Sequence, residues 1–217
     1  MSLPRIELMQ PTLLARPFHR EGWVFEEKID GWRMLAFKEG DHVRLLSRQG
    51  RDHTKRFPDL VKSIRALAPE TLILDGEVAI FDERLISRFE SMRHGRKPPG
   101  VATPPMFMAF YCLYVDGVDL RPRELRARRE ALVRATEYAK LLLTARRLAD
   151  DGLKAWRQVQ ERGYEGFVAK DESSPYAGGR TLSWLKVKHA EYRAEERGWS
   201  QDVDRPKTHP SDSSLSD

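Results

Sequence analysis

The segment 27–33 (EKIDGWR) combines side chains that can attack, orient and bind a phosphorylated ligand. Lys28 supplies an amine nucleophile, and Asp30 places a carboxylate close to it. Gly31 would let the backbone approach a ligand, and Arg33 can bind a phosphate or a sugar. Because ordinary exposed turns also contain KxDG sequences, this segment indicates a function only in combination with other motifs.

Three further charged motifs lie at the ends of expected strands, where a rigid sheet can hold a side chain in place. They are LDGE at 74–77, EGFVAK at 165–170 and WLKVK at 184–188. Lys186 and Lys188 are two residues apart, so a strand would turn both toward one face. Two like charges on one face repel each other unless an anion binds there; a solvent-exposed edge strand is the alternative.

The elements that must position these motifs are mostly strands. Hydrophobic patterns predict strands at 23–26, 33–38, 42–47, 71–81, 106–115, 166–170 and 183–188, and helices at 57–68, 83–92, 123–139 and 149–162. An acidic glycine turn at Asp75-Gly76 is expected to interrupt the strand at 71–81, and Gly163 is expected to cap the last helix. Because the strands mostly follow one another, we expect an α+β fold with antiparallel sheets.

Both ends of the chain are expected to lack regular structure. Residues 1–22 contain three prolines, which prevent a long helix, so we expect an irregular lead-in. Residues 191–217 are polar and lack apolar periodicity, which predicts a disordered tail. One domain over residues 1–190 follows.

Composition restricts the class of protein. The net charge of +5 favours a polyanionic partner such as nucleic acid, with a merely basic soluble enzyme as the alternative. Cys112 is the single cysteine, so the chain can form neither an intrachain disulfide nor a cysteine-based metal site. No signal-peptide core or membrane-spanning stretch is present, so we expect a reduced, cytoplasmic protein. Neither GxxxxGK[ST] nor GxGxxG after a strand occurs, which argues against P-loop and Rossmann sites.

Taken in order, the motifs resemble those of the covalent nucleotidyltransferases, and most closely the adenylation domain of bacterial ATP-dependent DNA ligases of the end-joining type. The segments that carry the resemblance are EKIDGWR at 27–33, SRQG at 47–50 through Thr54, LDGE at 74–77, FYCLYVDG at 110–117, EGFVAK at 165–170 and WLKVK at 184–188. The end-joining type is indicated by QPTLLA at 10–15 and by SPY at 174–176 followed by Gly179-Arg180. The resemblance covers roughly residues 8–190.

The resemblance implies an ATP-grasp-like nucleotidyltransferase fold, with two antiparallel sheets, flanking helices and the nucleotide pocket between the sheets. It also implies a reaction. Lys28 would attack the α-phosphorus of ATP, expel pyrophosphate and carry AMP, which then passes to the 5′-phosphate of nicked DNA before the phosphodiester forms. For the attack Lys28 must be neutral, and Lys186, Lys188 and Mg²⁺ are expected to lower its pKa and to stabilise charge on the α-phosphate.

By the same resemblance, individual residues acquire roles. Lys28, Lys186 and Lys188 are the expected catalytic residues. Glu165 is expected to bind magnesium, and Glu77 to contact the ribose or a metal-bound water. The expected nucleotide contacts are Arg33 and Arg48 on the ribose and phosphates, Phe110 stacked on adenine, Glu26 accepting the adenine amine, and Lys170 on the nucleotide or a metal-bound phosphate.

Some assignments stay open at the level of the sequence. Phe110 could instead pack in the core, and Asp30 could either orient Lys28 or cap a turn. Asp75 could serve only the backbone groups of its own turn. For duplex DNA, the candidate phosphate contacts are Arg51, Lys55, Arg56 and the basic loop at 93–97, with a solvated basic face as the alternative.

The chain departs from the family pattern in two places. Tyr111 stands where the family usually has aspartate after the aromatic residue. Ligases of this kind also continue after WLKVK into an OB-fold domain, whereas residues 191–217 are too few and too hydrophilic for such a barrel. We therefore expect slow adenylation of Lys28 and impaired nick sealing by this chain alone.

Several interpretations follow from the missing barrel. A naturally minimal enzyme, a partner that supplies an OB-type domain, and a truncated or decayed form are all open. Other repair proteins are further candidate partners, and a monomer is expected. The competing functions are another covalent nucleotidyltransferase, of the RNA ligase or capping type, and a non-catalytic nucleotide- or DNA-binding remnant.

Overall fold

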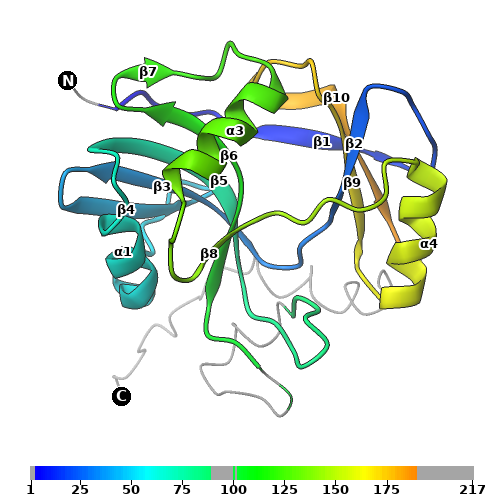
Figure 1. Ribbon diagram of the computed structural model, residues 1–217, viewed down its shortest axis with the longest axis horizontal. Helices are drawn as coiled ribbons and strands as arrows, with labels where there is room; N and C mark the ends of the chain where they lie inside the picture. The colour runs from blue at the N-terminus through cyan, green and yellow to red at the C-terminus, as the bar shows by residue number, and fades with distance from the viewer. Residues whose placement is uncertain (1–2, 89–99, 101, 190–217) are drawn as a thin grey trace, which may run out of the picture.

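Two β-sheets pack against each other and form the body of the molecule (Figure 1). The computed structural model describes residues 3–88, 100 and 102–189. Within these residues the mixture of sheets and a few helices confirms the expected α+β class. The tail at 191–217 and the basic loop at 93–97 lie outside the described residues. No helix in the described part is long and apolar enough to cross a membrane.

The larger sheet has the strand order β4-β3-β5-β6-β7, and β8 also pairs with β6, outside this order. Its strands are β3 (Trp32–Glu39), β4 (His42–Ser47), β5 (Thr71–Ala79), β6 (Met106–Val115), β7 (Val118–Asp119) and β8 (Leu142–Thr144). The neighbours along the main path are antiparallel, as expected, whereas β8 runs parallel to β6.

The smaller sheet has the strand order β1-β10-β9-β2. Its strands are β1 (Met9–Leu14), β2 (Trp23–Glu27), β9 (Gly166–Asp171) and β10 (Gly179–Lys188). Within residues 1–22 the expectation of an irregular lead-in is wrong, because Met9–Leu14 form an edge strand parallel to β10. Pro11 fits there because an edge strand leaves some N–H positions unpaired, and the register shifts directly after it.

The helices are shorter than the sequence pattern predicts. They are α1 (Pro58–Arg65), α3 (Leu125–Ala135) and α4 (Gly152–Arg162), with a 3₁₀ turn, η1, at Thr54–Arg56. Gly163 caps α4 in the left-handed conformation with φ 72°, as expected. The helix expected at 83–92 is wrong for residues 83–88, which form turns and a bridge; residues 89–92 lie outside the described range.

The larger sheet is buried on both faces, which explains the continuous apolar runs in its strands. Met34 and Ala36 of β3 pack in the cluster that contains α1 and part of α3, whereas Leu35 and Phe37 pack toward the smaller sheet. On its far side the smaller sheet packs against α4 through Phe167 and its neighbours. In Figure 1, α1 and α4 accordingly flank opposite sides of the two-sheet body. The space between the sheets is therefore bounded by rigid strands.

Cys112 is expected to resist alkylation in the folded protein. Its thiol is buried in β6 and donates a hydrogen bond to the Tyr114 carbonyl at 3.3 Å. Burial raises the pKa of the Cys112 thiol to about 12. Since the thiolate is the reactive form, iodoacetamide labelling at mildly alkaline pH should be slower in the folded chain than in urea by roughly two orders of magnitude or more.

The raised pKa of Cys112 also makes the stability of the fold depend on pH. Between pH 9 and about 12 the unfolded chain loses the thiol proton while the folded chain keeps it, so folding stability should fall as the pH rises through this range. Equal labelling rates in the folded and the urea-unfolded protein would show that Cys112 is accessible.

Candidate active site

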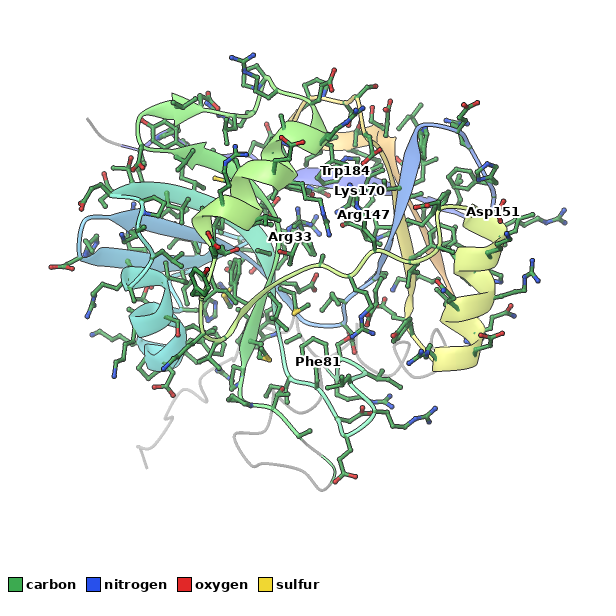
Figure 2. All side chains as sticks on the ribbon, in the orientation of Figure 1. Arg33, Phe81, Arg147, Asp151, Lys170 and Trp184 are labelled. Carbon is green, nitrogen blue, oxygen red and sulfur yellow. The ribbon has the colours of Figure 1, made fainter. Side chains whose placement is uncertain are left out.

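A cavity of about 260 Å³ lies between the two sheets. Its volume is close to the lower end of the range of about 300–1,000 Å³ that is typical for small-molecule sites. The lining side chains come from β1, β2 and the segment after it, β3, β5, β6, β9, β10 and the turn after β4, and they include Gln10, Glu26, Lys28, Arg33, Arg48, Glu77, Phe110, Lys170, Arg180, Trp184 and Lys186. Figure 2 shows Arg33, Lys170 and Trp184 in the region between the sheets. The structure thus brings most of the predicted site residues to one cavity.

Lys28 stands immediately after β2, at the wall of this cavity. Its backbone N–H donates to the Gly166 carbonyl at 3.0 Å, and its ammonium pairs with Oε2 of Glu165. Gly31 has a different role from the expected one. A Cβ at Gly31 would lie 2.4 Å from the Val78 carbonyl oxygen, so the glycine allows close approach to β5 rather than to a ligand.

The protein's own charges raise the pKa of Lys28; the expected lowering also invoked bound Mg²⁺ and stays a prediction. Burial is the largest single influence and lowers the pKa, but the attraction of Glu165, Glu77 and Asp30 together outweighs it. The sequence shows which charges are available, whereas the structure shows that the carboxylates are the ones close to the ammonium. In the ligand-free protein Lys28 therefore carries its proton firmly.

Lys186 and Lys188 lie on one face of β10, as their spacing predicts. The Lys188 ammonium lies 3.1 Å from Oε1 of Glu165, so this one carboxylate joins two lysines. Lys186 lines the cavity, and its pKa is lowered by burial and by repulsion from Lys28 and Lys188. Lys28, Lys186 and Lys188 form a positive cluster with Glu165 at its centre.

Glu77 is the second carboxylate beside Lys28. It projects from β5, and burial raises the pKa of Glu77 to about 7, with repulsion from Glu165 adding to the effect. Among the described residues no group of three or more His, Cys, Asp or Glu side chains could hold a metal. Glu77 lines the cavity and Glu165 lies beside Lys28, and one or two carboxylates are what Mg²⁺ takes in proteins while it keeps several waters.

Arg33 is held by Asp75, whose role the sequence did not reveal. The guanidinium donates to both Asp75 carboxylate oxygens at 2.6 Å, and Asp75 is fully buried. The second partner of Asp75 is the Tyr176 hydroxyl, at 2.9 Å. That hydroxyl also accepts a hydrogen bond from the Met9 N–H at 3.1 Å. Tyr176 therefore joins β1 of the smaller sheet to β5 of the larger one, directly behind Arg33.

A signal for Asp75 was present in the strand alternation. β5 runs without interruption from Thr71 to Ala79, so the expected turn at Asp75-Gly76 is wrong, although the pairing with β6 shifts register there. Ile73, Asp75 and Glu77 consequently share a face in the continuous pairing of β5 with β3. If a continuous strand had been expected here, its alternation would have placed the carboxylates of Asp75 and Glu77 together on the sheet face toward the cavity.

Removal of the Tyr176 hydroxyl is expected to cost stability, whereas removal of the Tyr111 hydroxyl is not. Tyr176→Phe leaves the Met9 N–H without an acceptor and removes the second partner of Asp75, which keeps Arg33; the loss should cost about 1–3 kcal/mol. Tyr111 lies in the same buried cluster, with ring centroids 5.9 Å apart, but its hydroxyl has no hydrogen-bond partner among the described residues. Urea unfolding of Tyr176→Phe and Tyr111→Phe should separate the two; equal losses would contradict a stabilising role for the hydrogen bonds of the Tyr176 hydroxyl.

The other end of the cavity is aromatic. Phe110 and Trp184 line it, and the Lys170 ammonium lies 4.7 Å from the Phe110 ring centroid and 5.1 Å from that of Trp184. Phe110 belongs to the core between the sheets and also borders the cavity, so core packing and cavity lining coincide. Glu26 lies here as well and is bound by Lys170 and by Arg129, a residue that the sequence patterns did not single out.

The remaining predicted residues occupy the margins. Arg48 is exposed at the cavity mouth and donates to the Gln10 side chain at 3.0 Å, which joins the two sheets there. Asp30 acts on Lys28 electrostatically, and its backbone N–H donates to the Ser87 hydroxyl at 2.9 Å. The candidate DNA contacts Arg51, Lys55 and Arg56 are exposed and do not line the cavity.

Comparison with known proteins yields one family. The family model described as "ATP dependent DNA ligase domain" matches residues 9–188. The "Multifunctional non-homologous end joining protein LigD" of Pseudomonas aeruginosa is 34% identical over 190 residues, which cover 85% of this chain and 22% of that protein. "DNA ligase C1" of Mycolicibacterium smegmatis is 34% identical over 205 residues, covering 87% of this chain and 59% of that protein.

Solved structures agree with the sequence matches. The structure described as "mycobacterial DNA ligase D complexed with ATP and MES" aligns with a TM-score of 0.71 and 31% identity, covering 84% of this chain and 60% of that chain. The ligase domain of LigD from M. tuberculosis aligns with the same TM-score and 30% identity. The chain thus spans 22% of the LigD protein and 60% of the aligned ligase structure.

Proposed function

The chain belongs to the family of ATP-dependent DNA ligase adenylation domains, and we propose that it carries AMP on Lys28 between ATP and a broken DNA strand. The observation that supports this most directly is the position of the Lys28 ammonium. It stands at the wall of a cavity between an aromatic end and a cluster of cations, and a carboxylate holds it in place. This is the arrangement that a nucleophile facing a nucleotide requires.

In the first step the Nζ–P bond forms at the α-phosphorus, and the bond to the pyrophosphate oxygen breaks. Lys28 must give up a proton for this, and the Glu165 carboxylate already accepts a hydrogen bond from its ammonium. A magnesium ion held by Glu165 and Glu77 would neutralise the carboxylates that raise the pKa of Lys28 and would polarise the phosphate. Burial and the nearby Lys186 would then lower the pKa of Lys28 and favour the neutral amine.

Charge that develops on the α-phosphate needs fixed donors. Lys186 and Lys188 present two ammonium groups from one face of β10, and a strand keeps them in place without reorganisation. Arg33, fixed by Asp75, and Arg48 at the mouth extend the positive lining toward the ribose and the outer phosphates. The base would occupy the aromatic end beside Phe110 and Trp184.

The second step would transfer AMP from Lys28 to a 5′-phosphate, and attack by the neighbouring 3′-hydroxyl would then join the strand and release AMP. Exposed Arg51, Lys55 and Arg56 are the proposed backbone contacts within the described residues. The relatives named as end-joining proteins support broken DNA as the acceptor.

A discharge experiment tests the acceptor. The chain is incubated with Mg²⁺ and ATP that is radiolabelled at the α-phosphate. It is then separated from free nucleotide and mixed with a nicked DNA duplex that carries a 5′-phosphate. We expect the label to move from protein to DNA. The matched controls are the same duplex without the 5′-phosphate, which should accept nothing, and a nicked RNA duplex, which should accept much less.

Each other outcome identifies a competing function. Transfer to RNA in preference to DNA would make the chain an RNA ligase, and a stable adduct with neither acceptor would point to the capping type. Failure of the wild-type chain to take any label from ATP would reject the catalytic proposal and favour the nucleotide- or DNA-binding remnant.

A further inference from the structure

Glu26 is a buried carboxylate that two cations hold from opposite oxygens. Its side chain is 1% exposed, and it lies in β2 at the aromatic end of the cavity. Oε1 accepts a hydrogen bond from Nη1 of Arg129, and Oε2 accepts one from Nζ of Lys170. With one cation on each oxygen, the carboxylate plane has a single orientation. Each oxygen retains a lone pair that can accept a further hydrogen bond.

Arg129 is itself anchored to the rigid part of the fold. Its Nη2 donates to the Ala145 carbonyl at 2.6 Å, while the Ala145 N–H donates to the Ala109 carbonyl of β6 at 2.8 Å. The backbone of α3 holds the other end of the side chain. Arg129 thus links the strand that carries Phe110 to the carboxylate of Glu26. The sequence separation between Arg129 and Glu26 is 103 residues, so no local pattern reveals the pair.

The position of Glu26 determines what it can recognise. The other acidic residues of the lining are engaged elsewhere: Glu27 lies 3.4 Å from Arg146, and Glu77 lies beside Lys28. Among these acidic residues Glu26 is therefore the one at the aromatic end, because its partner Lys170 lies over the Phe110 ring. An ionised carboxylate accepts hydrogen bonds from an exocyclic amine and repels a carbonyl oxygen. Its orientation relative to the aromatic rings decides whether a bound base can use it.

We propose that Arg129 is a positioning residue for base selection: by fixing Glu26 as an acceptor, it sets the preference for a purine that carries an exocyclic amine. The inference rests on the proposed function, because it concerns the base of the nucleotide that Lys28 attacks. Arg129 does not line the cavity and acts only through Glu26. Loss of Arg129 frees Oε1, and the carboxylate can then rotate about its remaining contact with Lys170.

The test compares ATP with purine riboside 5′-triphosphate, which lacks the amine. For the full chain, kcat/KM for covalent nucleotide transfer is measured with each triphosphate, and the ratio gives the contribution of the amine. In Arg129→Met the ratio should fall by about tenfold, since one charge-assisted hydrogen bond no longer orients the acceptor. Arg129→Lys, which can reach Glu26 but cannot also bind the Ala145 carbonyl, should give an intermediate ratio.

The control is Arg126→Met, on the exposed side of the same helix, which should keep the wild-type ratio. A general weakening of the fold would lower the rates with both nucleotides equally. An unchanged ratio in Arg129→Met would therefore overturn the inference. If Arg129→Met does not fold by circular dichroism, Arg129→Lys decides, and a wild-type ratio in that variant would overturn it.

The failure of the proposed function is separable from the failure of this inference. If the wild-type chain forms no covalent nucleotide with either compound, the catalytic proposal fails. The equilibrium dissociation constants of the two triphosphates, measured by quenching of tryptophan fluorescence, then give the same ratio for base selection. A ratio that responds to Arg129→Met would support the role of Arg129, and a ratio that does not respond would refute it.

Discussion

Replacement of Lys28 by arginine is expected to abolish the covalent bond between the protein and AMP while the fold is kept. Arginine retains a positive charge, so it can still pair with Glu165, which would otherwise keep only Lys188 as a partner. It stays protonated at any pH at which the protein is folded, so it cannot act as a nucleophile. The adduct should fall from readily detectable to absent in an ATP incubation, whereas the urea midpoint should change little.

The matched control is Lys154→Arg on the exposed surface of α4, which makes the same chemical change away from the cavity. It should label as the wild-type chain does. An adduct of undiminished amount in Lys28→Arg would show that another residue carries the nucleotide. A large loss of stability would show that the guanidinium does not fit and would require Lys28→Gln as a second variant.

Replacement of Asp75 by alanine is expected to be the most destabilising single change near the cavity. It leaves the Arg33 guanidinium without its bidentate partner and removes the acceptor of the Tyr176 hydroxyl. Removal of one member of a buried ion pair costs about 3–5 kcal/mol, because the other charge stays out of water. Urea unfolding followed by tryptophan fluorescence gives the free energy of unfolding directly.

Two comparisons make the Asp75 prediction specific. Asp119→Ala removes a carboxylate that pairs with Arg121 near the surface, and it should cost no more than about 1 kcal/mol. The double variant Asp75→Ala with Arg33→Met should regain part of the loss, since it also removes the unpaired cation. A loss in Asp75→Ala no larger than that in Asp119→Ala would show that the buried network contributes little.

Strand alternation and motif order predicted much of the fold and the site. Lys186 and Lys188 share a face of β10 as their spacing required. The strand that carries Glu77 and the strands that adjoin Lys28 and Glu165 were located from apolar runs. The edge strand Met9–Leu14 was missed because Pro11 argues against a strand, whereas an edge position tolerates it. A sequence pattern does not show which strand lies at an edge.

The supporting contacts could not be predicted, because they join residues distant in the chain. Tyr176 and Asp75 are 101 residues apart, and the pair of Arg129 with Glu26 is as distant. The carboxylates that raise the pKa of Lys28 were overlooked for the same reason. The direction of the Lys28 pKa shift depends on which of the nearby charges are closest, and these are the carboxylates of Glu165 and Glu77. Most of the site residues predicted from the sequence lie around the cavity, whereas the charges that act between them depend on distances.

The central claim is that Lys28 is the carrier of AMP, and one measurement tests it most directly. The wild-type chain is incubated with ATP and Mg²⁺, its intact mass is recorded, and the modified peptide is sequenced by tandem mass spectrometry. We predict a single added AMP, located on Lys28. An AMP located on any other residue, or an unchanged mass after prolonged incubation of folded protein, would contradict the claim.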